Sequence, residues 1–435
     1  MAANAEVVRR ITPSLARLGL PRWARPETWA YAIPGSRDFR LDLLRGFLVF
    51  AMVVDHLGGD SALTAISGNN QFLVSAAEGF VFISGLLMGI VYGSRVRRLG
   101  LAGGVAAVLH RATVLYFTVA GLTLTFVGIY LFTDLPLWMD RSGGLGVDSP
   151  LQALVGTLTL HYSYHATDIL LIYVLLVGAA PLPFYLLATG RTRHLLVGSW
   201  LLWAVYQVAP QQAEVPWPVA NSVDLPFAAW QALFYTALTL GYHRARLARL
   251  TRALRLWPVV ALLGASTAGL VALSQIHHAG GLAALGIPGL DDGSFEFLFR
   301  KSSLGPGRVV AFFVIAGFAQ QVVTRLWAPL QRAFGWLLIP LGQKSLLSYG
   351  THLFLLGPAY AAYSAVASVV PNGPELNLVT QAAVLLLVWG FAKSHARLGG
   401  LAGQVAAEVQ RVATSTATPA LQWARATVPH RASWR

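Results

Sequence analysis

The composition of this chain excludes an ordinary soluble fold. Of its 435 residues, 55% are hydrophobic and only 11% are charged, whereas about a quarter of the residues in a soluble domain carry a charge. The net charge of +14 does not indicate a nucleic-acid-binding protein, because the arginines cluster in hydrophilic connections and termini, as in the cytoplasmic loops of membrane proteins. The absence of cysteine excludes disulfides and cysteine-based metal sites.

The apolar segments, taken in chain order, predict an all-α polytopic membrane protein with about ten transmembrane helices. Almost all Arg-rich connections then fall on one side, which the positive-inside rule assigns to the cytoplasm together with both termini. We divide the chain into a basic cytoplasmic segment (1–40), a transmembrane domain (41–393) and a cytoplasmic tail (394–435). The predicted spans are 41–58, 72–93, 105–132, 168–189, 194–209, 225–243, 257–276, 307–324, 341–370 and 377–392.

Two further features accompany this topology. No cleavable signal peptide is expected, because the first apolar span begins after about forty residues and has no small-residue cleavage site behind it. Residues 151–167 are interpreted as a short outer or re-entrant helix. Membrane lipids are the expected surroundings, and a homo-oligomer is compatible with the sequence.

The first two spans carry ionisable residues at bilayer depth, namely Arg45, Asp55, His56 and Glu78. Each such residue costs roughly 2.5–3.5 kcal/mol on insertion scales and is therefore a functional candidate. Arg45 and His56 are eleven residues apart, which puts them on one helix face with a rise of about 16 Å between them. A guanidinium at one mouth and an imidazole deep in the membrane suit a long ligand with an anionic head and a reactive tail, such as acyl-CoA.

These residues also carry a family resemblance. Arg45, ten intervening residues and His56 resemble the R-x10-H signature of the membrane acyltransferase type 3 superfamily. The longer motif LDLLRG…MVVDH…SAAEGFVFISG is similar to the OpgC family, whose members add succinyl groups to osmoregulated periplasmic glucans. The resemblance implies a bacterial inner-membrane O-acyltransferase that moves a succinyl or acetyl group from cytoplasmic acyl-CoA to a periplasmic glucan or another polysaccharide.

Three residues are the candidate catalytic groups. His56 either acts as general base on a sugar hydroxyl or takes the acyl group itself; the alternative is a buried, hydrogen-bonded histidine. Asp55 points about 100° away from His56 on a helix, so it serves another contact. Glu78 orients His56, binds an acceptor hydroxyl or, as a structural alternative, pairs with Arg111.

Five basic residues are candidates for binding the acyl donor or the free carboxylate of its acyl group. Arg45 suits phosphate through its planar fork of donors, although a snorkelling arginine has the same place in a sequence. His110 and Arg111 either complete an anionic donor site or only anchor the third span at the cytoplasmic surface. The free carboxylate of a succinyl group needs a cation, which Lys344, Arg111 or Arg308 would supply.

Substrate-binding candidates come from two spans. Ser345, Ser348, Tyr349 and His352 occupy positions i, i+3, i+4 and i+7, so they form one polar stripe on an otherwise apolar helix. The glycine, serine and histidine of this segment resemble the late helix of the acyltransferase superfamily. We assign Ser348, Tyr349 and His352, together with Ser84 in the second span, to acceptor or donor binding; hydrogen bonding between helices is the alternative.

Glycines 85, 89 and 93 follow Ser84 at four-residue spacing. Small residues in such a row let two membrane helices approach closely. The pattern predicts a tight helix contact along this side of the second span.

Aromatic and polar residues gather in the predicted outer connections. They belong to the interfacial belt of a membrane protein or stack on the sugar rings of an acceptor. The neighbouring histidines at 277 and 278 have no companion ligands at a metal-binding spacing, and no metal is predicted. The aromatic cluster comprises His161, Tyr162, Tyr164, His165, Trp138, Trp217 and Trp230, with Asp168 beside it.

A glycan or lipid-linked sugar transporter, or flippase, is the main alternative function. Buried charges and polar helix faces also mark transport pathways. The lack of a visible two-half repeat disfavours this alternative. A non-catalytic partner of a polysaccharide synthase is a third interpretation.

Overall fold

The computed structural model describes residues 28–31, 37–68, 71–133, 144–164, 166–221, 225–250, 256–281, 291–370 and 372–395. Within these ranges the only regular structure is helical, apart from one isolated bridge between Tyr162 and Ala220. The predicted all-α class is therefore confirmed. Trp138, His165 and most of the predicted segments 1–40 and 394–435 lie outside the described residues.

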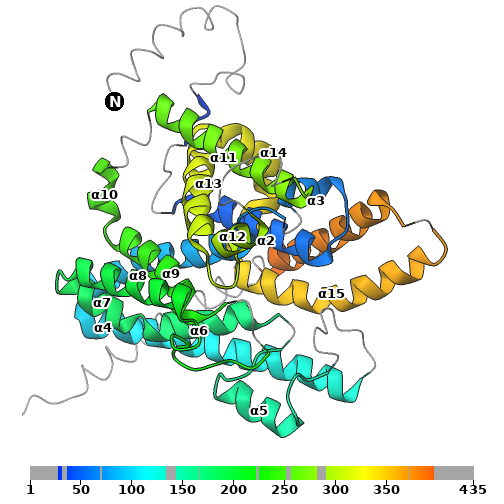
Figure 1. Cartoon of the computed structure of the whole chain (residues 1–435), viewed down its shortest axis with the longest axis horizontal. Helices are drawn as coiled ribbons and strands as arrows, with labels where there is room; N and C mark the ends of the chain where they lie inside the picture. Colours follow the sequence, from blue (N-terminus) through cyan, green and yellow to red (C-terminus); the bar gives the residue numbers. More distant parts are fainter. Residues whose placement is uncertain are drawn as a thin grey trace, which may run out of the picture.

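Some neighbouring helices are separated by a single residue, such as α6 and α7 or α14 and α15, whereas longer connections precede α5, α9 and α12 (Figure 1). Their bounds are α2 Phe39–Leu57, α3 Ala62–Ser67, α4 Ala76–Phe132, α5 Pro150–Leu158, α6 Asp168–Ala179, α7 Pro181–Ala188, α8 Thr192–Val208, α9 Phe227–Tyr242, α10 Arg244–Leu250, α11 Trp257–His278, α12 Asp292–Phe299, α13 Pro306–Arg325, α14 Trp327–Gln343 and α15 Ser345–Ala367. A last helix, Pro374–His395, returns alongside α15.

Five helices in the described part of the chain are long and apolar enough to cross a membrane, which fits a multi-pass membrane protein. One of them, α4, includes most of the second and all of the third predicted span. The two parts meet at a kink at Gly100, whose φ of 77° favours glycine. The other predicted spans coincide with helices that are shorter, less apolar or more charged, so the count of ten and the sides of the termini stay predictions. The five helices are Ala76–Phe132, Asp168–Ala188, Trp257–His278, Pro306–Arg325 and Pro374–His395.

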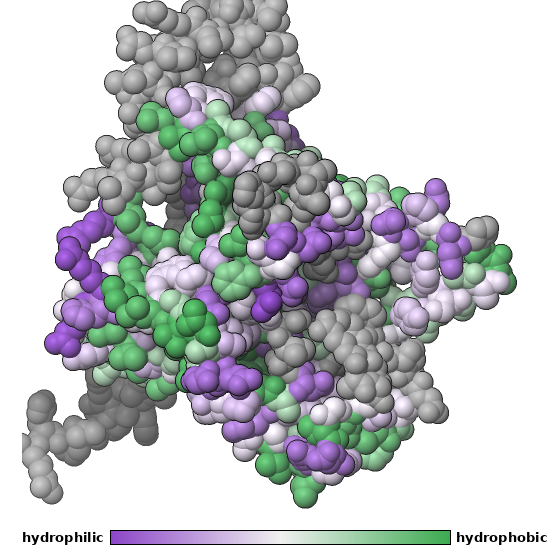
Figure 2. All heavy atoms as spheres, in the orientation of Figure 1, coloured by the Kyte–Doolittle hydropathy of each residue, from purple (hydrophilic) through white to green (hydrophobic). Residues whose placement is uncertain are grey.

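The surface carries many apolar side chains. Leu201 on α8, Leu262 on α11 and Val310 on α13 are all about three-fifths exposed or more. Figure 2 shows hydrophobic residues spread over these helices. Such exposure is unfavourable in water and suits contact with lipid.

Helix α14 was not predicted. The predicted eighth and ninth spans, 307–324 and 341–370, leave residues 325–340 as a connection. In the structure Pro340 lies inside α14, one turn from its end. The last turn of α14 lies against the first turn of α2, because Gly342 packs on the backbone of Asp42. The first turn of α14 is held by the segment that precedes α2, where Ala328 donates its N–H to Trp29 O. Helix α14 thus brings the chain to the first turn of α2, and α15 begins beside that turn.

Helices α2 and α14 meet backbone to backbone at Gly46 and Gly342. A Cβ atom placed on Gly46 would lie 1.8 Å from Leu338 O, and one on Gly342 would lie 1.8 Å from Asp42 O. Only glycine fits either position without moving a helix backbone.

The predicted glycine contact on the second span is confirmed. A Cβ atom at Gly85 or Gly89 would lie 2.3 Å from Phe234 O or 2.0 Å from Leu238 O, respectively. The partner is α9, and its Gly241 approaches Leu86 O in the same manner. This contact fixes α4 against α9.

A buried ion pair joins the starts of α4 and α13. Glu78 is fully buried in the first turn of α4, where one carboxylate oxygen accepts from Ser75 N (2.9 Å) and Ser75 Oγ (2.6 Å). Its other oxygen accepts from Arg308 Nε, and Arg308 Nη1 also donates to Phe299 O (3.2 Å). The predicted pairing of Glu78 with Arg111 is therefore wrong. The same ion pair means that Arg308 already has a carboxylate partner and is not available for a succinyl group.

We expect Gly46→Ala to lower the melting temperature of the protein in detergent. The added methyl overlaps Leu338 O, and overpacking of this kind costs about 1–3 kcal/mol. Gly121→Ala is the matched control, because a Cβ there meets nothing within 4 Å and alanine favours helix. Equal melting of Gly46→Ala and wild type would contradict the described α2–α14 contact.

Glu78→Gln should destabilise the fold more strongly, because it leaves the buried Arg308 guanidinium without its counter-charge. Breaking a buried pair in this way costs about 3–5 kcal/mol. Glu296→Gln removes a carboxylate of the exposed pair with Arg300 (3.5 Å) and should cost about 0–1 kcal/mol. Thermal unfolding of both variants measures the contrast, and a similar shift for the two would argue against the buried pair.

Candidate functional site

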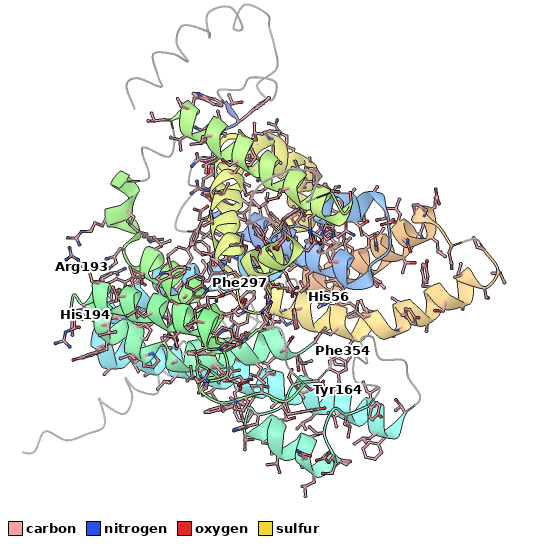
Figure 3. All side chains as sticks on the ribbon, viewed as in Figure 1. His56, Tyr164, Arg193, His194, Phe297 and Phe354 are labelled. Carbon is pink, nitrogen blue, oxygen red and sulfur yellow. The ribbon has the colours of Figure 1, made fainter. Side chains whose placement is uncertain are left out.

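Two histidines from distant parts of the chain meet at the end of α2. His56 Nδ1 lies 3.0 Å from His352 Nε2, and the ring centroids are 5.2 Å apart. His56 belongs to the last turn of α2 and is half-buried, whereas His352 on α15 is fully buried. Figure 3 shows His56 where α2 passes α15. The sequence predicts His56 as a catalytic residue and His352 as a substrate-binding residue independently, and the structure brings them together.

The hydrogen bonds of this pair determine which nitrogens carry protons. His352 Nδ1 contacts Tyr349 O, and a carbonyl oxygen can only accept, so His352 Nδ1 donates. In the neutral ring His352 Nε2 then carries a lone pair and accepts from His56 Nδ1. His56 Nε2 is consequently the nitrogen without a proton. That tautomer is the one a general base at His56 Nε2 requires.

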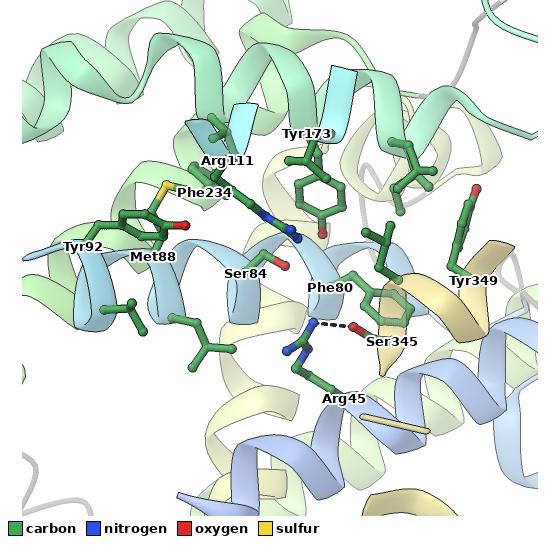
Figure 4. Close-up of a pocket in the computed structure, with 17 residues that line it drawn as sticks. Arg45, Phe80, Ser84, Met88, Tyr92, Arg111, Tyr173, Phe234, Ser345 and Tyr349 are labelled. Carbon is green, nitrogen blue, oxygen red and sulfur yellow. Dashed lines mark hydrogen bonds between the residues drawn. The ribbon is translucent and has the colours of Figure 1, made fainter. Parts of the chain in front are cut away.

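A cavity of about 320 Å³ is lined by side chains from α2, α4, α6, α9 and α15 (Figure 4). Arg45 reaches into it from α2 and donates from Nη2 to Ser345 Oγ at the start of α15. Arg111 enters from the opposite wall, and Ser84 lies between the two arginines. The lining residues are Arg45, Phe80, Ser84, Leu87, Met88, Val91, Tyr92, Arg111, Leu115, Ile169, Leu170, Tyr173, Val177, Phe234, Ser345, Leu346 and Tyr349.

The polar groups of the cavity suit an anion. Two guanidinium groups line it, and none of its described lining residues is an aspartate or glutamate. Arg45 Nε is buried and has no hydrogen-bond partner among the described residues. Because a buried donor without a partner costs free energy, a ligand with acceptor oxygens would stabilise this arrangement.

Tyr349 connects the cavity with the histidine pair. Its ring lines the cavity, its hydroxyl donates to Ala166 O, and its backbone carbonyl accepts from His352. The contacts Arg45–Ser345 and His56–His352 follow one another in the same order along α2 and α15, so these helices run in the same direction. Along α2 the two functional positions are about 16 Å apart. A ligand that bridges them must have an extended arm of comparable length.

The other predicted catalytic groups lie in different surroundings. Asp55 accepts from Ser67 Oγ in α3, which ties the end of α2 to the following turn. The predicted separation of Asp55 from the His56 face agrees with this contact. Both carboxylate oxygens of Glu78 are engaged by Ser75 and Arg308, so the geometry does not support Glu78 as the group that orients His56. His352 occupies that place.

The remaining predicted residues divide between the cavity and its surroundings. Ser84 and Arg111 line the cavity, whereas His110 beside Arg111 is exposed and Lys344 caps α15 outside the lining. Ser348 is fully buried and donates to Leu341 O at 3.4 Å, which is the contact between helices that had been the structural alternative.

Sequence reasoning missed Tyr173. It projects into the cavity from α6 (Figure 4). Its surroundings in the sequence are continuously apolar, so no periodicity distinguishes its side from any other. Its hydroxyl among apolar neighbours was the one available signal.

Within the described residues, no group of three histidine, aspartate or glutamate side chains is arranged to hold a metal ion. The candidate site has two parts: a histidine pair at the end of α2 and a cavity lined by two arginines.

Comparison with known proteins identifies a single family. No curated protein and no solved structure matches the chain. The family model described as OpgC protein matches residues 37–399, which include α2, α15 and all the residues that line the cavity. Because that match covers most of the chain, this protein belongs to the OpgC family.

Proposed function

We propose that this protein is a bacterial inner-membrane O-acyltransferase. It moves a succinyl or acetyl group from cytoplasmic acyl-CoA to a hydroxyl of a periplasmic glucan or related polysaccharide. Membership of the OpgC family favours a glucan-modifying transferase of the acyltransferase type. The observation that carries the proposal is the His56–His352 pair, which holds His56 in the tautomer that a general base needs.

The transfer begins when His56 Nε2 takes the proton of the acceptor hydroxyl. The alkoxide oxygen forms a bond to the thioester carbon, and the carbon–sulfur bond then breaks. His56 Nε2 then gives this proton to the leaving thiolate, so the products are the ester and free CoA thiol and the base is regenerated. His352 positions the base, and its hydrogen bond from His56 Nδ1 strengthens when His56 becomes an imidazolium.

A second order of events uses the same residues. His56 Nε2 attacks the thioester itself and carries the acyl group until the sugar hydroxyl takes it. The carbon–sulfur bond breaks as His56 Nε2 takes the acyl group, so CoA leaves as the thiolate before the ester forms. When the sugar hydroxyl takes the acyl group, its proton is released to water and balances the thiolate. A burst of CoA release and a trapped acyl-protein distinguish this route from direct transfer.

The cavity between Arg45 and Arg111 is the proposed donor site. Its two guanidinium groups bind anionic oxygens of the donor, and the apolar wall accommodates the neutral arm. The roughly 16 Å between Arg45 and His56 along α2 lets the reactive end approach His56 while the charged end stays at Arg45. A charged donor on one side of the membrane thus meets a sugar on the other without crossing completely.

His56→Ala should lower acyl transfer about 100- to 10,000-fold, which is the usual contribution of a general base. The assay uses the full chain in lipid nanodiscs, labelled succinyl-CoA and acetyl-CoA in separate reactions, and a mixed glucan acceptor. His194→Ala is the control, because His194 is an exposed histidine on α8 (Figure 3). His352→Gln should retain more activity than His352→Leu, since only glutamine keeps a hydrogen-bond acceptor for His56.

Two results would count against the mechanism. Transfer that survives His56→Ala unchanged would remove His56 as the base while keeping the enzyme. No labelled glucan with either donor, from well-folded protein and several acceptors, would favour the transporter instead.

Arg45→Gln and Arg111→Gln should each raise the KM for the acyl donor roughly 10- to 100-fold, the equivalent of one lost charge-assisted hydrogen bond. Arg98→Gln is the matched control, since Arg98 is an exposed arginine on α4. Initial rates against donor concentration at saturating glucan measure the change. An unchanged donor KM in both cavity variants would mean that the donor binds elsewhere.

A further inference from the structure

A strap of chain between α5 and α6 is fastened to the connection that precedes α9. Ser163 N donates to Ala220 O (3.1 Å), Ala220 N donates to His161 O (2.7 Å), and Asn221 Nδ2 donates to Ser163 O (3.1 Å). Two connections that are more than fifty residues apart in sequence therefore form one unit. Both connections lie on the predicted outer side of the membrane.

This unit contains three non-glycine residues in the left-handed region. Their φ values are 61° at Leu160, 55° at Ala166 and 58° at Asn221. Leucine and alanine adopt this conformation at a cost, and such residues cluster where a loop is held in one shape for function. The hydrogen bonds across the unit hold the backbone in place.

The strained backbone presents a rigid pair of rings. His161 stacks on Trp217 with centroids 5.0 Å apart and planes at 14°. Trp217 Nε1 donates to Leu160 O (2.9 Å), and His161 Nδ1 donates to Thr159 O (2.9 Å). The neutral His161 ring therefore keeps its Nε2 lone pair as an acceptor. His161 is exposed and Trp217 is half-buried, so the ring pair is open to a ligand.

Further ring contacts lead from this unit toward the histidine pair. Tyr162 stacks on Tyr164 (6.3 Å), and Tyr164 contacts Tyr130 of α4 (6.1 Å). One turn earlier on α4, Phe126 contacts Phe354 of α15 (4.8 Å), two residues after the histidine that pairs with His56. Figure 3 shows Phe354 on the side of α15 toward Tyr164. Tyr130 and Phe354 are 37% and 42% exposed, whereas Tyr162, Tyr164 and Phe126 are buried. The route is therefore aromatic packing with two exposed rings on it.

We propose that the His161–Trp217 pair is a subsite for a neutral hexose ring of the acceptor glucan, several sugar units away from the hydroxyl that is acylated. This proposal rests on the proposed function. The C–H face of a hexose stacks on a flat aromatic surface, and His161 Nε2 accepts a hydrogen bond from a sugar hydroxyl. A tryptophan that only anchors a membrane interface requires neither a fixed ring plane nor a strained backbone.

Direct binding tests the subsite independently of catalysis. A fluorescently labelled linear glucan of about ten glucose units is titrated into the full chain in nanodiscs, with no acyl donor present. Trp217→Ala and His161→Ala should each weaken binding about tenfold, whereas Trp217→Phe, which keeps an aromatic face, should stay close to wild type. Trp257→Ala is the control, because Trp257 is 64% exposed on α11 and belongs to another part of the molecule.

A transfer assay then separates this subsite from the reaction centre. Trp217→Ala should raise the KM for the long glucan about tenfold, with kcat unchanged, and should not change transfer to free glucose, which is too short to reach both places. Wild-type affinity in folded Trp217→Ala and His161→Ala would overturn the subsite and leave the proposed function intact. If Trp217→Ala fails to fold, His161→Ala and Trp217→Phe decide the question. Absence of transfer to any glucan would overturn the proposed function, while the binding titration would still decide the subsite.

Discussion

The contact between α2 and α14 is the constraint on which the candidate site depends. Gly46 and Gly342 let the two backbones touch. Arg45, the residue next to Gly46, donates to Ser345 at the start of α15. Since α15 follows α14 after a single residue, the same contact determines where α15 starts. His352 on α15 is therefore placed beside His56 on α2.

The charged side chains around the candidate site fall into two kinds. Glu78 and Arg308 neutralise each other and have their remaining hydrogen bonds satisfied by Ser75 and Phe299 O, so this pair stabilises the starts of two helices. Arg45 and Arg111 have no carboxylate beside them in the described cavity lining. A membrane protein that keeps two such guanidinium groups at one cavity is suited to an anionic ligand, because the ligand supplies the missing counter-charge.

The proposed reaction uses both ends of α2. The arginine cavity would hold the anionic donor, and the half-buried His56 would meet the acceptor. The strap between α5 and α6 and its stacked rings lie on the acceptor's proposed approach. Tyr349 contacts this strap, lines the cavity and contacts the histidine pair. One residue thus couples the region proposed for the donor with the region proposed for the sugar.

Several properties were determined by the sequence alone, because they depend on local order. The apolar composition predicts a membrane protein, the text around Arg45 and His56 predicts the OpgC family, and four-residue spacing predicts the glycine contact of α4. Each of these follows from composition, from a contiguous motif or from the period of one helix. The shared face of Arg45 and His56 is of the same kind.

The tertiary structure decided the partners. His56 pairs with a histidine 296 positions away, Glu78 pairs with an arginine 230 positions away, and Tyr173 enters the cavity from an apolar helix. Helical periodicity reports which side of a helix a residue occupies but not which helix packs against that side. The existence of α14 also depends on packing between distant segments. Its contact with α2 keeps the segment helical although a proline lies near its end. Local pattern therefore identified the candidate residues, and long-range packing decided which of them act together.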